Sequence, residues 1–543
     1  MSLDQSLVAE VAEWIALDPS PTDAALLQKW LDEGNESELR RCFNGFLQFG
    51  TAGLRGPIGP GPSCMNRAVV HRAAAGIAAY MKERRLTRVV IGRDARYGSE
   101  DFTQESAEVL TGAGMEVFVL PRPMATPVLA YATTALKADV GIMVTASHNP
   151  PQDNGYKVYL GGVVDGTRYA GSQIVSPADI QIAAEISKIH HLAPKKVGWT
   201  VLDDEIFNDY VSATASLARS HHPLKVVYSA MHGVGSESID AVFKKAEFSE
   251  LHYVQEQRMP DPAFPTVAFP NPEEPGAIDL SLALARKIDA DIVIANDPDA
   301  DRCAAAINDP EVGWRMLRGD EVGAILGHYI ATTMKDSTTG KAFANSIVSS
   351  SILKKIADKH GIEFSETLTG FKWLAKIPNL RYGYEEALGY CVDASNVNDK
   401  DGISAALLIA QCAGELKASG KTMADYLDEI WATYGFHATE QISIRVRNIA
   451  QVDSLLARLR KSPPRSVSGY ELTQADDLEH PTNGLPPTNG LRYWFGPNLR
   501  VIIRPSGTEP KVKCYIELCA PQNEAILILP VLRTELAALM TVE

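Results

Sequence analysis

Three acidic residues alternate with other residue types directly after a short apolar segment. The segment Asp291–Ala295 leads into NDPDADRC, which places carboxylates at Asp297, Asp299 and Asp301. Like charges crowded into one loop repel one another unless a cation lies between them. Mg²⁺ prefers oxygen ligands and commonly binds a few carboxylates together with a phosphate oxygen. The pattern therefore predicts a Mg²⁺ site rather than a solvated acidic turn, and Arg302 stands where an EF-hand loop needs glycine.

A serine follows another apolar segment. Val140–Val144 leads into TASHNP, which places Ser147 in a loop that ends with Asn149-Pro150. Asn-Pro favours a turn, so we expect the loop to hold the serine hydroxyl rigidly and to expose it. A capping serine in an ordinary strand-ending turn is the alternative. The GxSxG pattern of many hydrolase nucleophiles does not surround this serine.

Cationic and hydroxyl side chains gather in a third segment, near the end of the chain. RPSGTEPKVK begins at Arg504, contains Ser506, Gly507 and Thr508, and ends at Lys513. The backbone N–H groups of such a turn can form an anion-binding nest. An arginine can bind a phosphate through two hydrogen bonds, and hydroxyl groups can donate further ones. The segment predicts a phosphate site, with a hairpin turn that carries incidental charges as the alternative.

Two adjacent carboxylates interrupt the otherwise apolar segment YEEALGY. Glu385 and Glu386 could accept hydrogen bonds from the hydroxyl groups of a sugar. An ordinary surface loop is the simpler interpretation when this segment is taken alone.

Each of these side chains must be positioned by the element that precedes it. Strand-like segments that alternate with helix-like ones predict α/β units with mostly parallel sheets. Ligands bind such folds at loops beyond the carboxyl ends of strands, where the serine and the acidic loop fall. From residue 441 onward the pattern changes and predicts a smaller α+β domain. The predicted strands that lead into polar loops are Arg88–Ile91, Val140–Val144, Leu224–Tyr228 and Asp291–Ala295.

Helix signals are also present. Asn66 directly precedes RAVVHRAAAGIAAYMKE and is predicted to cap that helix. Thr126 is predicted to cap another helix, with Pro127 at the first helical position. Ala525–Met540 is apolar but is interrupted by a proline and two charged residues, so we expect a core helix there.

Length and composition define the class of protein. The chain has 543 residues, of which 45% are hydrophobic and 22% are charged. Hydrophobic cores stop growing near roughly 250–300 residues, so we expect several domains. The N-terminus lacks the pattern of a signal peptide, and no segment is apolar for long enough to span a bilayer.

Cysteine content and charge narrow the class further. The seven cysteines form no CxxC pair, which predicts buried free thiols in a reducing cytoplasm. The net charge of −15 argues against nucleic acid or an anionic membrane as a partner. Any phosphate site must therefore be built locally from cations and backbone N–H groups. A monomer and a homodimer are both compatible with the sequence.

The four motifs, in this chain order, resemble the α-D-phosphohexomutase superfamily of phosphoglucomutases and phosphomannomutases. TASHNP resembles its phosphoserine loop, DPDADR its metal loop, YEEALGY its sugar-specificity loop and RPSGTEP its phosphate loop. The segments GTAGLRG, GRD, NGYK and KDG support the resemblance, which extends from about Phe49 to Ile516. Within the superfamily, FGTAGLRG, ETLTGFKW, EEALGY and DKDG look most like the phosphoglucomutase-2 or phosphopentomutase-like branch.

The resemblance implies a fold of three similar α/β domains with mixed sheets and a smaller α+β C-terminal domain, around a central cleft. We assign residues 1–205 to an N-terminal extension and the phosphoserine domain, and 206–325 to the metal-binding domain. Residues 326–440 are assigned to the sugar-binding domain, and 441–543 to the phosphate-binding domain.

The implied activity is that of a phosphosugar mutase, an isomerase that interconverts the 1-phosphate and 6-phosphate of glucose, of mannose or of both. A phosphopentomutase, which acts on ribose 1-phosphate and ribose 5-phosphate, and a sugar-1,6-bisphosphate synthase are the alternatives. A non-catalytic sensor would be expected to lose the serine or the metal ligands. A simple phosphatase would not need the second phosphate loop, so both of these classes are disfavoured.

The resemblance also implies roles for individual residues. Ser147 would carry the transferred phosphate and would bind one Mg²⁺ per chain together with Asp297, Asp299 and Asp301. A bisphosphorylated sugar would be the intermediate, and glucose 1,6-bisphosphate the activator. The other residues expected to act in catalysis are His148, Lys157, Arg55 and Arg302. The residues expected to bind the phosphosugar are Glu385, Glu386, Lys372, Arg504, Ser506, Gly507, Thr508 and Lys513.

Two departures from the family pattern concern the sugar site. The family's sugar loop reads Gly-Glu-x-Ser-Gly-His, whereas Leu388 replaces the serine here and Tyr390 the histidine. The proton-transfer role of that histidine cannot be carried over. Lys157 could exchange the hydroxyl proton instead if its pKa is lowered by burial. Gly370-Phe371 stands where some relatives have Gly-His, and we expect Lys372 to supply the cation there.

Overall fold

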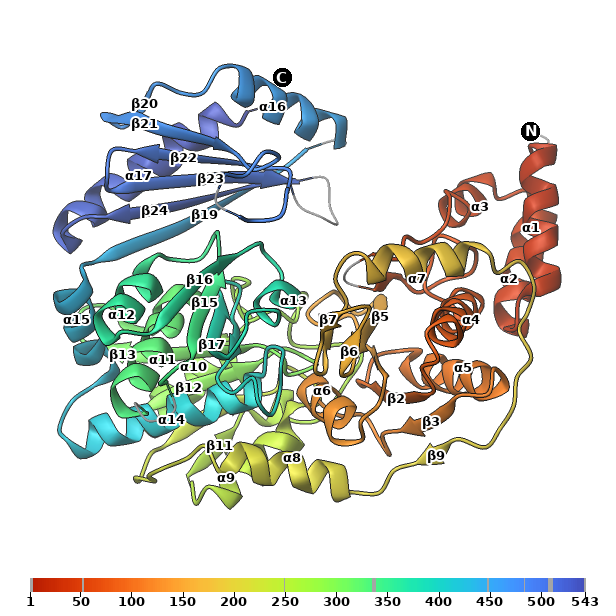
Figure 1. Ribbon diagram of the computed structural model, residues 1–543, viewed down its shortest axis with the longest axis horizontal. Helices are drawn as coiled ribbons and strands as arrows, with labels where there is room; N and C mark the ends of the chain where they lie inside the picture. The colour runs from red at the N-terminus through yellow and green to blue at the C-terminus, as the bar shows by residue number, and fades with distance from the viewer. Residues whose placement is uncertain are drawn as a thin grey trace. The chain divides into compact units, whose positions relative to one another are not determined.

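The chain folds into two compact units, shown in Figure 1. The computed structural model describes residues 3–50, 53–248, 250–334, 338–446, 449–482, 484–505 and 511–541. The first unit contains Met1–Leu317 and Ala387–Gly420. The second unit contains Arg318–Glu386 and Lys421–Glu543.

The first sheet of the first unit positions Ser147. Its strand order is β1-β5-β4-β2-β3-β9, with β8 paired to β5. Strands β2, β3 and β4 run parallel, whereas β5 pairs antiparallel with both β4 and β1. The predicted strands thus form the parallel centre of a mixed sheet. The strands are β1 (Leu54–Pro57), β2 (Arg88–Arg93), β3 (Glu116–Val119), β4 (Val140–Val144), β5 (Asp153–Leu160), β8 (Ser172–Gln173) and β9 (Thr200–Val201), and β6 (Val163–Val164) pairs with β7 (Thr167–Arg168) beside them.

The two predicted helix caps of this domain have different outcomes. Asn66 caps its helix as predicted, because its side chain accepts a hydrogen bond from the backbone N–H of Val69. The prediction for Thr126 was wrong: Thr126 is the first helical residue, and Ala125 precedes the helix without a side-chain cap. The Thr126 hydroxyl donates to Asp299 instead, so it is not available to the helix end. The helices are α4 (Arg67–Glu83), α5 (Ser99–Gly112), α6 (Thr126–Ala135) and α7 (Ala178–Ser187).

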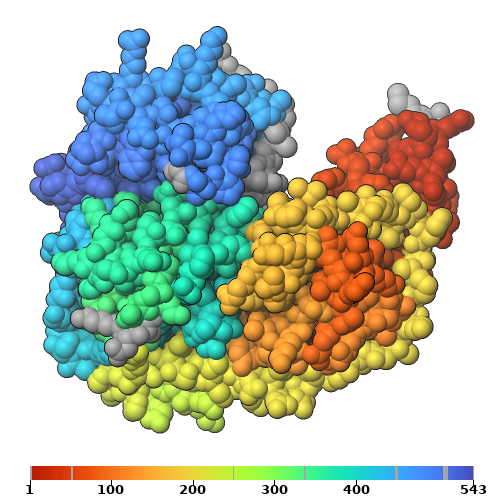
Figure 2. All heavy atoms as spheres, in the orientation of Figure 1, coloured from red at the N-terminus to blue at the C-terminus, as the bar shows by residue number. Residues whose placement is uncertain are grey.

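Three N-terminal helices precede this domain: α1 (Gln5–Leu17), α2 (Pro21–Asp32) and α3 (Glu36–Cys42). They enclose a small core of their own, which includes Val11, Leu27 and Leu39. Figure 2 shows them in red as a lobe that protrudes from the rest of the first unit.

The second sheet of the first unit positions the acidic loop. Its order is β11-β10-β12-β13-β14, with parallel pairing of β10 to β11 and β12, and antiparallel pairing beyond β12. All five residues of β12 are buried, which is typical of a central strand. The strands are β10 (Val226–Ser229), β11 (Leu251–Tyr253), β12 (Ile292–Asn296), β13 (Cys303–Asp309) and β14 (Gly313–Met316). The helices are α8 (Glu205–Ala215), α9 (Gly235–Lys245) and α10 (Asp279–Ile288), and the later segment adds β18 (Gly389–Cys391) and α14 (Gly402–Ala418) to the same unit.

The second unit begins with a parallel sheet. Strand β15 lies between β16 and β17 and pairs parallel with both. The strands are β15 (Ala342–Ser346), β16 (Glu363–Thr367) and β17 (Leu380–Glu385). The helices of this part are α11 (Gly319–Thr333), α12 (Ile352–His360), α13 (Phe371–Leu374) and α15 (Met423–Tyr434).

The C-terminal part of the second unit is an antiparallel sheet with two helices. Its strand order is β19-β24-β23-β22-β21-β20. The helices α16 and α17 bury apolar side chains in one core with the strands, among them Leu456, Phe495 and Leu532. The elements are β19 (His437–Arg445), α16 (Ile449–Lys461), β20 (Ser466–Val467), β21 (Tyr470–Asp477), β22 (Leu491–Phe495), β23 (Leu499–Pro505), β24 (Lys511–Cys519) and α17 (Gln522–Leu539). This architecture matches the predicted smaller α+β domain.

Two further predictions concern the core and the thiols. Helix α17 continues through Pro530 and buries only one face, so the predicted core helix is amphipathic in its packing. All seven cysteines are free, and all but Cys519 are buried, as predicted. Among the described residues, no helix combines the length and the apolar character needed to cross a membrane.

A buried carboxylate connects three segments of the first domain. Glu105 on α5 is fully buried and accepts hydrogen bonds from Arg67 and His71 on α4. It also pairs with Lys195, which lies in the segment that leads to β9. Burial alone would raise the pKa of Glu105, but the hydrogen bonds from these three residues lower it to about 2.

We expect Glu105→Gln to lower the free energy of unfolding by about 3 kcal/mol, the lower end of the cost of breaking a buried ion pair. A carboxyl whose folded pKa is depressed stabilises the protein above its usual pKa, and this contribution is lost as the pH falls through the folded pKa. The Tm difference between wild type and variant should therefore shrink between pH 4.5 and about 2. Thermal unfolding followed by circular dichroism measures it.

Glu108→Gln is the matched control, since Glu108 pairs with the same Lys195 at the edge of the cluster. It should have a much smaller effect on Tm. A Tm gap for Glu105→Gln that stays constant down to pH 2 would contradict this account of the cluster.

Candidate active site

The Ser147 loop is held in an unusual backbone conformation. Ser147 follows β4 and has a φ of +53°, in the left-handed region that non-glycine residues rarely adopt. Its N–H donates to the hydroxyl of Thr145 at 2.9 Å. Arg96 donates to the backbone oxygens of Ser147 and Asn149, each at 2.6 Å, and to that of Pro150 at 2.8 Å. These contacts fix the loop, as predicted, but Ser147 is buried and not exposed, because its hydroxyl faces the acidic loop.

The three aspartates of the acidic loop converge. Asp297, Asp299 and Asp301 are fully buried, and one oxygen from each lies within 4.8 Å of the others. The Ser147 hydroxyl donates to Oδ2 of Asp297 at 2.9 Å. The loop packs tightly on the residues after β10: a Cβ on Gly233 would lie 2.3 Å from Cα of Pro298, so only glycine fits there.

The acidic loop fits a magnesium ion. Among the described residues, Oδ1 of Asp299 and Oδ1 of Asp301 have no hydrogen-bond partner although they are buried. Buried carboxylate oxygens without partners are costly and rare. Oxygen ligands from closely spaced carboxylates are the set that Mg²⁺ prefers. Asp297, Asp299, Asp301 and the Ser147 oxygen are therefore the residues that could hold the ion.

Cationic side chains surround the aspartates. Lys157 on β5 donates from Nζ to Asp299 at 2.6 Å and to Asp301 at 2.8 Å. Lys400, which precedes α14, lies 3.0 Å from the same oxygen of Asp301. Nε of Arg302 lies 4.0 Å from carboxylate oxygens of Asp297 and Asp301. The site thus contains the local cations that phosphate binding by this acidic chain requires.

Burial and these charges shift the pKa values in different directions. Burial and mutual repulsion hold the pKa of Asp297 well above its usual value. The same effects act on Asp299 and Asp301, but the neighbouring lysine ammonium groups outweigh them and lower the pKa of both. Burial alone would lower the pKa of Lys157, yet Asp299 and Asp301 raise it. The lowered pKa on which proton exchange by Lys157 would depend is therefore not favoured by these neighbours.

His148 and Arg55 complete this side of the site. Nδ1 of His148 lies 3.2 Å from the Ser147 hydroxyl. Burial, with Arg302 and Arg55 nearby, holds the pKa of His148 well below its usual value, so the ring is neutral. Arg55 lies on β1 and donates to the side chain of Asn149 at 3.2 Å. The structure thus brings together all the residues predicted for catalysis and for the metal.

Three residues of this site were not assigned from the sequence. Arg96 clamps the Ser147 loop, Thr126 donates to Asp299 at 2.7 Å, and Lys400 pairs with Asp301. Their segments GRDARYGS, Thr126-Pro127 and KDG were noted for other reasons. The available signal was their place in loops after strands, but only the fold shows which side chains face the aspartates.

The residues predicted for the sugar lie in the second unit. Glu386 follows β17, and its Oε2 accepts hydrogen bonds from the hydroxyls of Ser346 at 3.1 Å and Ser349 at 3.0 Å. Glu385 accepts from the backbone N–H of Gly370 at 2.5 Å. Glu385 therefore shapes the segment that carries Lys372, while Glu386 is the carboxylate held by serines.

The predicted phosphate segment is described in part. Ser506, Gly507 and Thr508 lie outside the described residues. Burial and the charge of Glu386 hold the pKa of Tyr515 on β24 well above its usual value, although Arg504, at the end of β23, hydrogen-bonds this tyrosine and acts in the opposite direction. Nζ of Lys513 lies 6.0 Å from the centre of the Tyr515 ring. Tyr515 thus has Arg504, Lys513 and Glu386 around it.

The two residues that depart from the family pattern belong to the core. Leu388 and Tyr390 are buried. The backbone oxygen of Leu388 accepts from the N–H of Cys303, and that of Tyr390 accepts from the N–H of Asp401. These residues connect the β18 segment to β13 and to the start of α14.

Comparison with known proteins agrees with this fold. Four models described as phosphoglucomutase/phosphomannomutase domains match the chain in order. The alpha/beta/alpha domains I, II and III match residues 47–188, 205–312 and 318–434, and the C-terminal domain matches 443–527. The predicted fold class of three α/β domains and a C-terminal domain is confirmed.

Individual relatives cover most of the chain. A probable phosphomannomutase of Haemophilus influenzae is 44% identical over 459 residues, which is 83% of this chain and 93% of that protein. A human phosphopentomutase is 34% identical over 579 residues, which is 96% of this chain and 93% of the relative. A solved structure of a phosphoglucomutase/phosphomannomutase family protein from Burkholderia thailandensis has a TM-score of 0.70 at 19% identity, covering 90% of this chain and 97% of that one. The chain belongs to the phosphoglucomutase/phosphomannomutase family of phosphosugar mutases.

Proposed function

We propose that this phosphosugar mutase interconverts the 1-phosphate and 6-phosphate of glucose, of mannose or of both through a phosphorylated Ser147. The observation that carries the proposal is the Ser147 hydroxyl, 2.9 Å from Asp297 of the acidic loop, in which two buried aspartate oxygens have no hydrogen-bond partner among the described residues. In this proposal residues 1–205 carry the phosphoserine, 206–325 the metal loop, 326–440 the sugar loop and 441–543 the phosphate loop.

Two balanced half-reactions account for the isomerisation. In the first, the phosphoryl group leaves Oγ of Ser147 for a free hydroxyl of the sugar phosphate, and a proton passes from the sugar to the serine side. In the second, the bisphosphorylated sugar returns its other phosphoryl group to Ser147 and takes the proton back. Glucose 1,6-bisphosphate would prime the serine, since it is the intermediate of the glucose reaction.

Residues of the first unit would bind and orient the phosphoryl group. Phosphoryl transfer depends mainly on positioning and on electrostatic stabilisation of the transferring group. Arg302 supplies positive charge beside Asp297, and Arg96 holds the backbone of Ser147 in place. His148 is positioned to exchange a proton with the Ser147 oxygen. A bound Mg²⁺ would neutralise negative charge on the phosphoryl oxygens.

Residues of the second unit would bind the rest of the substrate. Glu386 would accept hydrogen bonds from the sugar hydroxyls, with Glu385 and Lys372 beside it. Arg504, Ser506, Gly507, Thr508 and Lys513 would bind the phosphate that is not being transferred. The free cysteines support a cytoplasmic location for such an enzyme.

Competition between two substrates tests the proposed function. Glucose 1-phosphate and ribose 1-phosphate are supplied in equal amounts with Mg²⁺ and a trace of glucose 1,6-bisphosphate, and ³¹P NMR follows the products. We expect the glucose 6-phosphate signal to appear first. Earlier appearance of ribose 5-phosphate would favour the phosphopentomutase alternative, which the human relative supports. Release of inorganic phosphate alone would reject the mutase.

Ser147→Ala should abolish turnover, because the variant lacks the oxygen that accepts the phosphoryl group. Its Tm should remain within a few degrees of wild type, since the Arg96 clamp holds backbone oxygens and not the serine side chain. Intact-mass spectrometry after incubation with glucose 1,6-bisphosphate should show a phosphorylated wild type and an unmodified variant. Normal turnover by the variant would disprove the phosphoserine mechanism.

Asp299→Asn should weaken Mg²⁺ binding by roughly 100-fold, because it removes one carboxylate from the set of ligands. Isothermal titration with MgCl₂ measures this without turnover. Asp309→Asn is the control, because Asp309 pairs with Arg315 at the far end of β13, the strand that follows the acidic loop. This variant should leave the Mg²⁺ affinity unchanged. Equal Mg²⁺ affinity in Asp299→Asn and wild type would place the ion elsewhere.

Arg504→Ala should raise KM for the sugar phosphate by roughly 10-fold or more, the scale expected for loss of a charge-assisted hydrogen bond. Phosphorylation of Ser147 should still be detectable by mass spectrometry at high glucose 1,6-bisphosphate. Steady-state kinetics give the KM. An unchanged KM would remove Arg504 from the phosphate site.

A further inference from the structure

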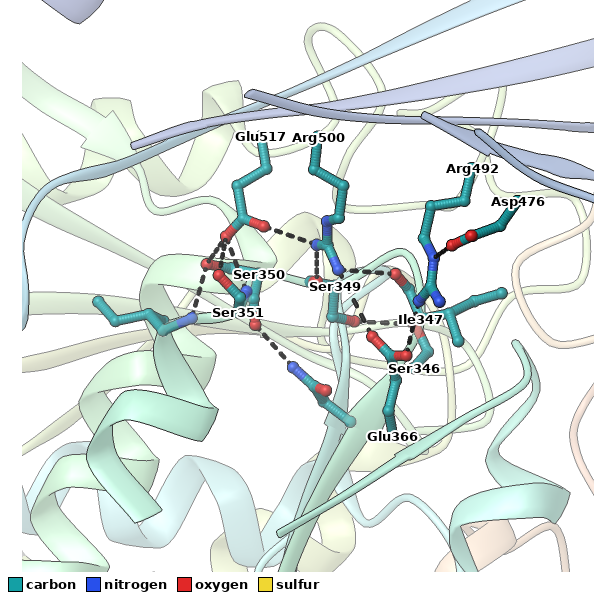
Figure 3. Close-up of polar contacts among 12 residues, drawn as sticks. Ser346, Ile347, Ser349, Ser350, Ser351, Glu366, Asp476, Arg492, Arg500 and Glu517 are labelled. Atoms are coloured by element: carbon teal, nitrogen blue, oxygen red, sulfur yellow. Dashed lines mark hydrogen bonds and ion pairs between the residues drawn. The ribbon is translucent and has the colours of Figure 1, made fainter. Parts of the chain in front are cut away.

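The second unit contains a buried pair of opposite charges, whereas the acidic loop belongs to the first unit. Arg500 on β23 and Glu517 on β24 are direct partners in the sheet register. Their side chains are 5% and 4% exposed, and Nη2 of Arg500 lies 2.7 Å from Oε2 of Glu517 (Figure 3). A buried ion pair adds little net stability, because both charges lose their hydration. The other hydrogen bonds of these two side chains connect them to a neighbouring loop.

Both side chains bind residues 346–351, the segment from the last residue of β15 to the residue before α12. This segment is called here the serine loop. Arg500 donates to the backbone oxygens of Ile347 at 3.1 Å and Ser349 at 2.5 Å. Oε1 of Glu517 accepts from the N–H of Ser351 at 2.7 Å and from the hydroxyl of Ser350 at 2.7 Å. Figure 3 shows the two side chains reaching the loop from the C-terminal sheet. The arginine and the glutamate thus fix successive parts of one loop.

The serine loop in turn holds Glu386. The hydroxyls of Ser346 and Ser349 both donate to Oε2 of Glu386, and the N–H of Glu386 donates to the hydroxyl of Ser349 at 3.1 Å. On the opposite side, a Cβ on Gly319 would lie 1.7 Å from the backbone oxygen of Glu386, so helix α11 begins in direct contact with it. The position of the Glu386 carboxylate therefore depends on the shape of the serine loop.

Apolar packing supports the same connection. Ile347 and Val348 of the serine loop pack in one buried cluster with Ile502 of β23 and Tyr515 of β24. Asp320 at the start of α11 accepts from the N–H of Ser350 at 2.7 Å. Because the loop is held by packing and by hydrogen bonds from both sheets of the unit, it has little room to adopt another shape.

We propose that Arg500 and Glu517 are positioning residues for the sugar site: they hold the serine loop in the shape that orients the Glu386 carboxylate. The inference rests on the proposed role of Glu386 as a ligand of the sugar hydroxyls. It assigns a part in sugar recognition to two residues of the C-terminal sheet that lie outside the predicted phosphate segment.

A metal site is the alternative use of Glu517. His437, Glu517 and Cys519 present ligand atoms within 4.8 Å of one another. However, Oε1 of Glu517 already accepts hydrogen bonds from His437 and from two serines, and Oε2 pairs with Arg500. The hydrogen-bond network accounts for the cluster.

Arg492 provides a matched control. It lies on β22 of the same sheet, is similarly buried, and pairs with Glu366 at 2.8 Å and Asp476 at 3.0 Å (Figure 3). Within the described part of the chain, Arg492 makes no hydrogen bond to the serine loop. Arg492→Lys therefore alters a comparable ion pair without releasing the serine loop.

Arg500→Lys keeps the charge but cannot donate to two backbone oxygens and to Glu517 at once. We expect kcat/KM for the preferred sugar phosphate, glucose 1-phosphate or ribose 1-phosphate, to fall roughly 10–100-fold, the scale of a misplaced binding group. The dissociation constant for inorganic phosphate should stay within about twofold of wild type, because the phosphate segment is untouched. Arg492→Lys should leave both quantities within about twofold.

A double-mutant cycle decides whether Arg500 acts through Glu386. In a Glu386→Gln background, Arg500→Lys should cause almost no further loss of kcat/KM, because residues that act through one group are not additive. Additive losses would overturn the inference, as would an equal loss in Arg492→Lys. If Glu386→Gln itself leaves kcat/KM unchanged, the proposed role of Glu386 fails and this inference fails with it.

Ser349→Ala covers the case in which Arg500→Lys does not fold. It removes the hydroxyl that holds Glu386 and keeps the backbone oxygen that Arg500 binds. It should lower kcat/KM on the same scale as Arg500→Lys and should also lose its effect in the Glu386→Gln background. Full sugar-phosphate activity in a folded Ser349→Ala protein would overturn the inference.

Discussion

The mutual repulsion of three buried carboxylates is the constraint on which the first unit depends. Asp297, Asp299 and Asp301 sit without solvent at the end of a central strand, where their charges are expensive unless cations compensate them. Lys157 and Lys400, from separate segments, supply part of that compensation. Within the part of the chain that the structure describes, two aspartate oxygens have no hydrogen-bond partner and are available to a metal ion. The strands and helices around the loop can be understood as the means of delivering those cations.

The second unit uses buried charge in a different way. There the pair Arg500 and Glu517 is neutral as a whole, and its hydrogen bonds extend to backbone oxygens and serine hydroxyls rather than to a ligand. The first unit thus concentrates charge around the acidic loop, whereas in the second unit an ion pair of opposite charges holds the serine loop in place. Both arrangements are costly to desolvate, so each is compensated by opposite charges from its own unit.

Much of the fold and site could be predicted because the information is local. The strand before Ser147, the strand before Asp297 and the Asn66 cap are read from neighbouring residues, and they were predicted correctly. Contacts between distant segments could not be read in this way. The prediction that Thr126 caps a helix was wrong, because its hydroxyl donates to Asp299, far away in the chain. The direction in which the pKa of Lys157 is shifted could not be read from the sequence for the same reason, since its carboxylate neighbours follow a strand of another sheet.

Three stretches of chain that are distant in the sequence meet at the acidic loop of the first unit. Thr126 lies on α6 and Lys157 on β5, the aspartates follow β12 of the second sheet, and Lys400 directly precedes Asp401, the cap of α14. None of these stretches could keep the carboxylates together by itself. The three stretches therefore depend on one another, because a change in any one of them alters the groups that surround the carboxylates.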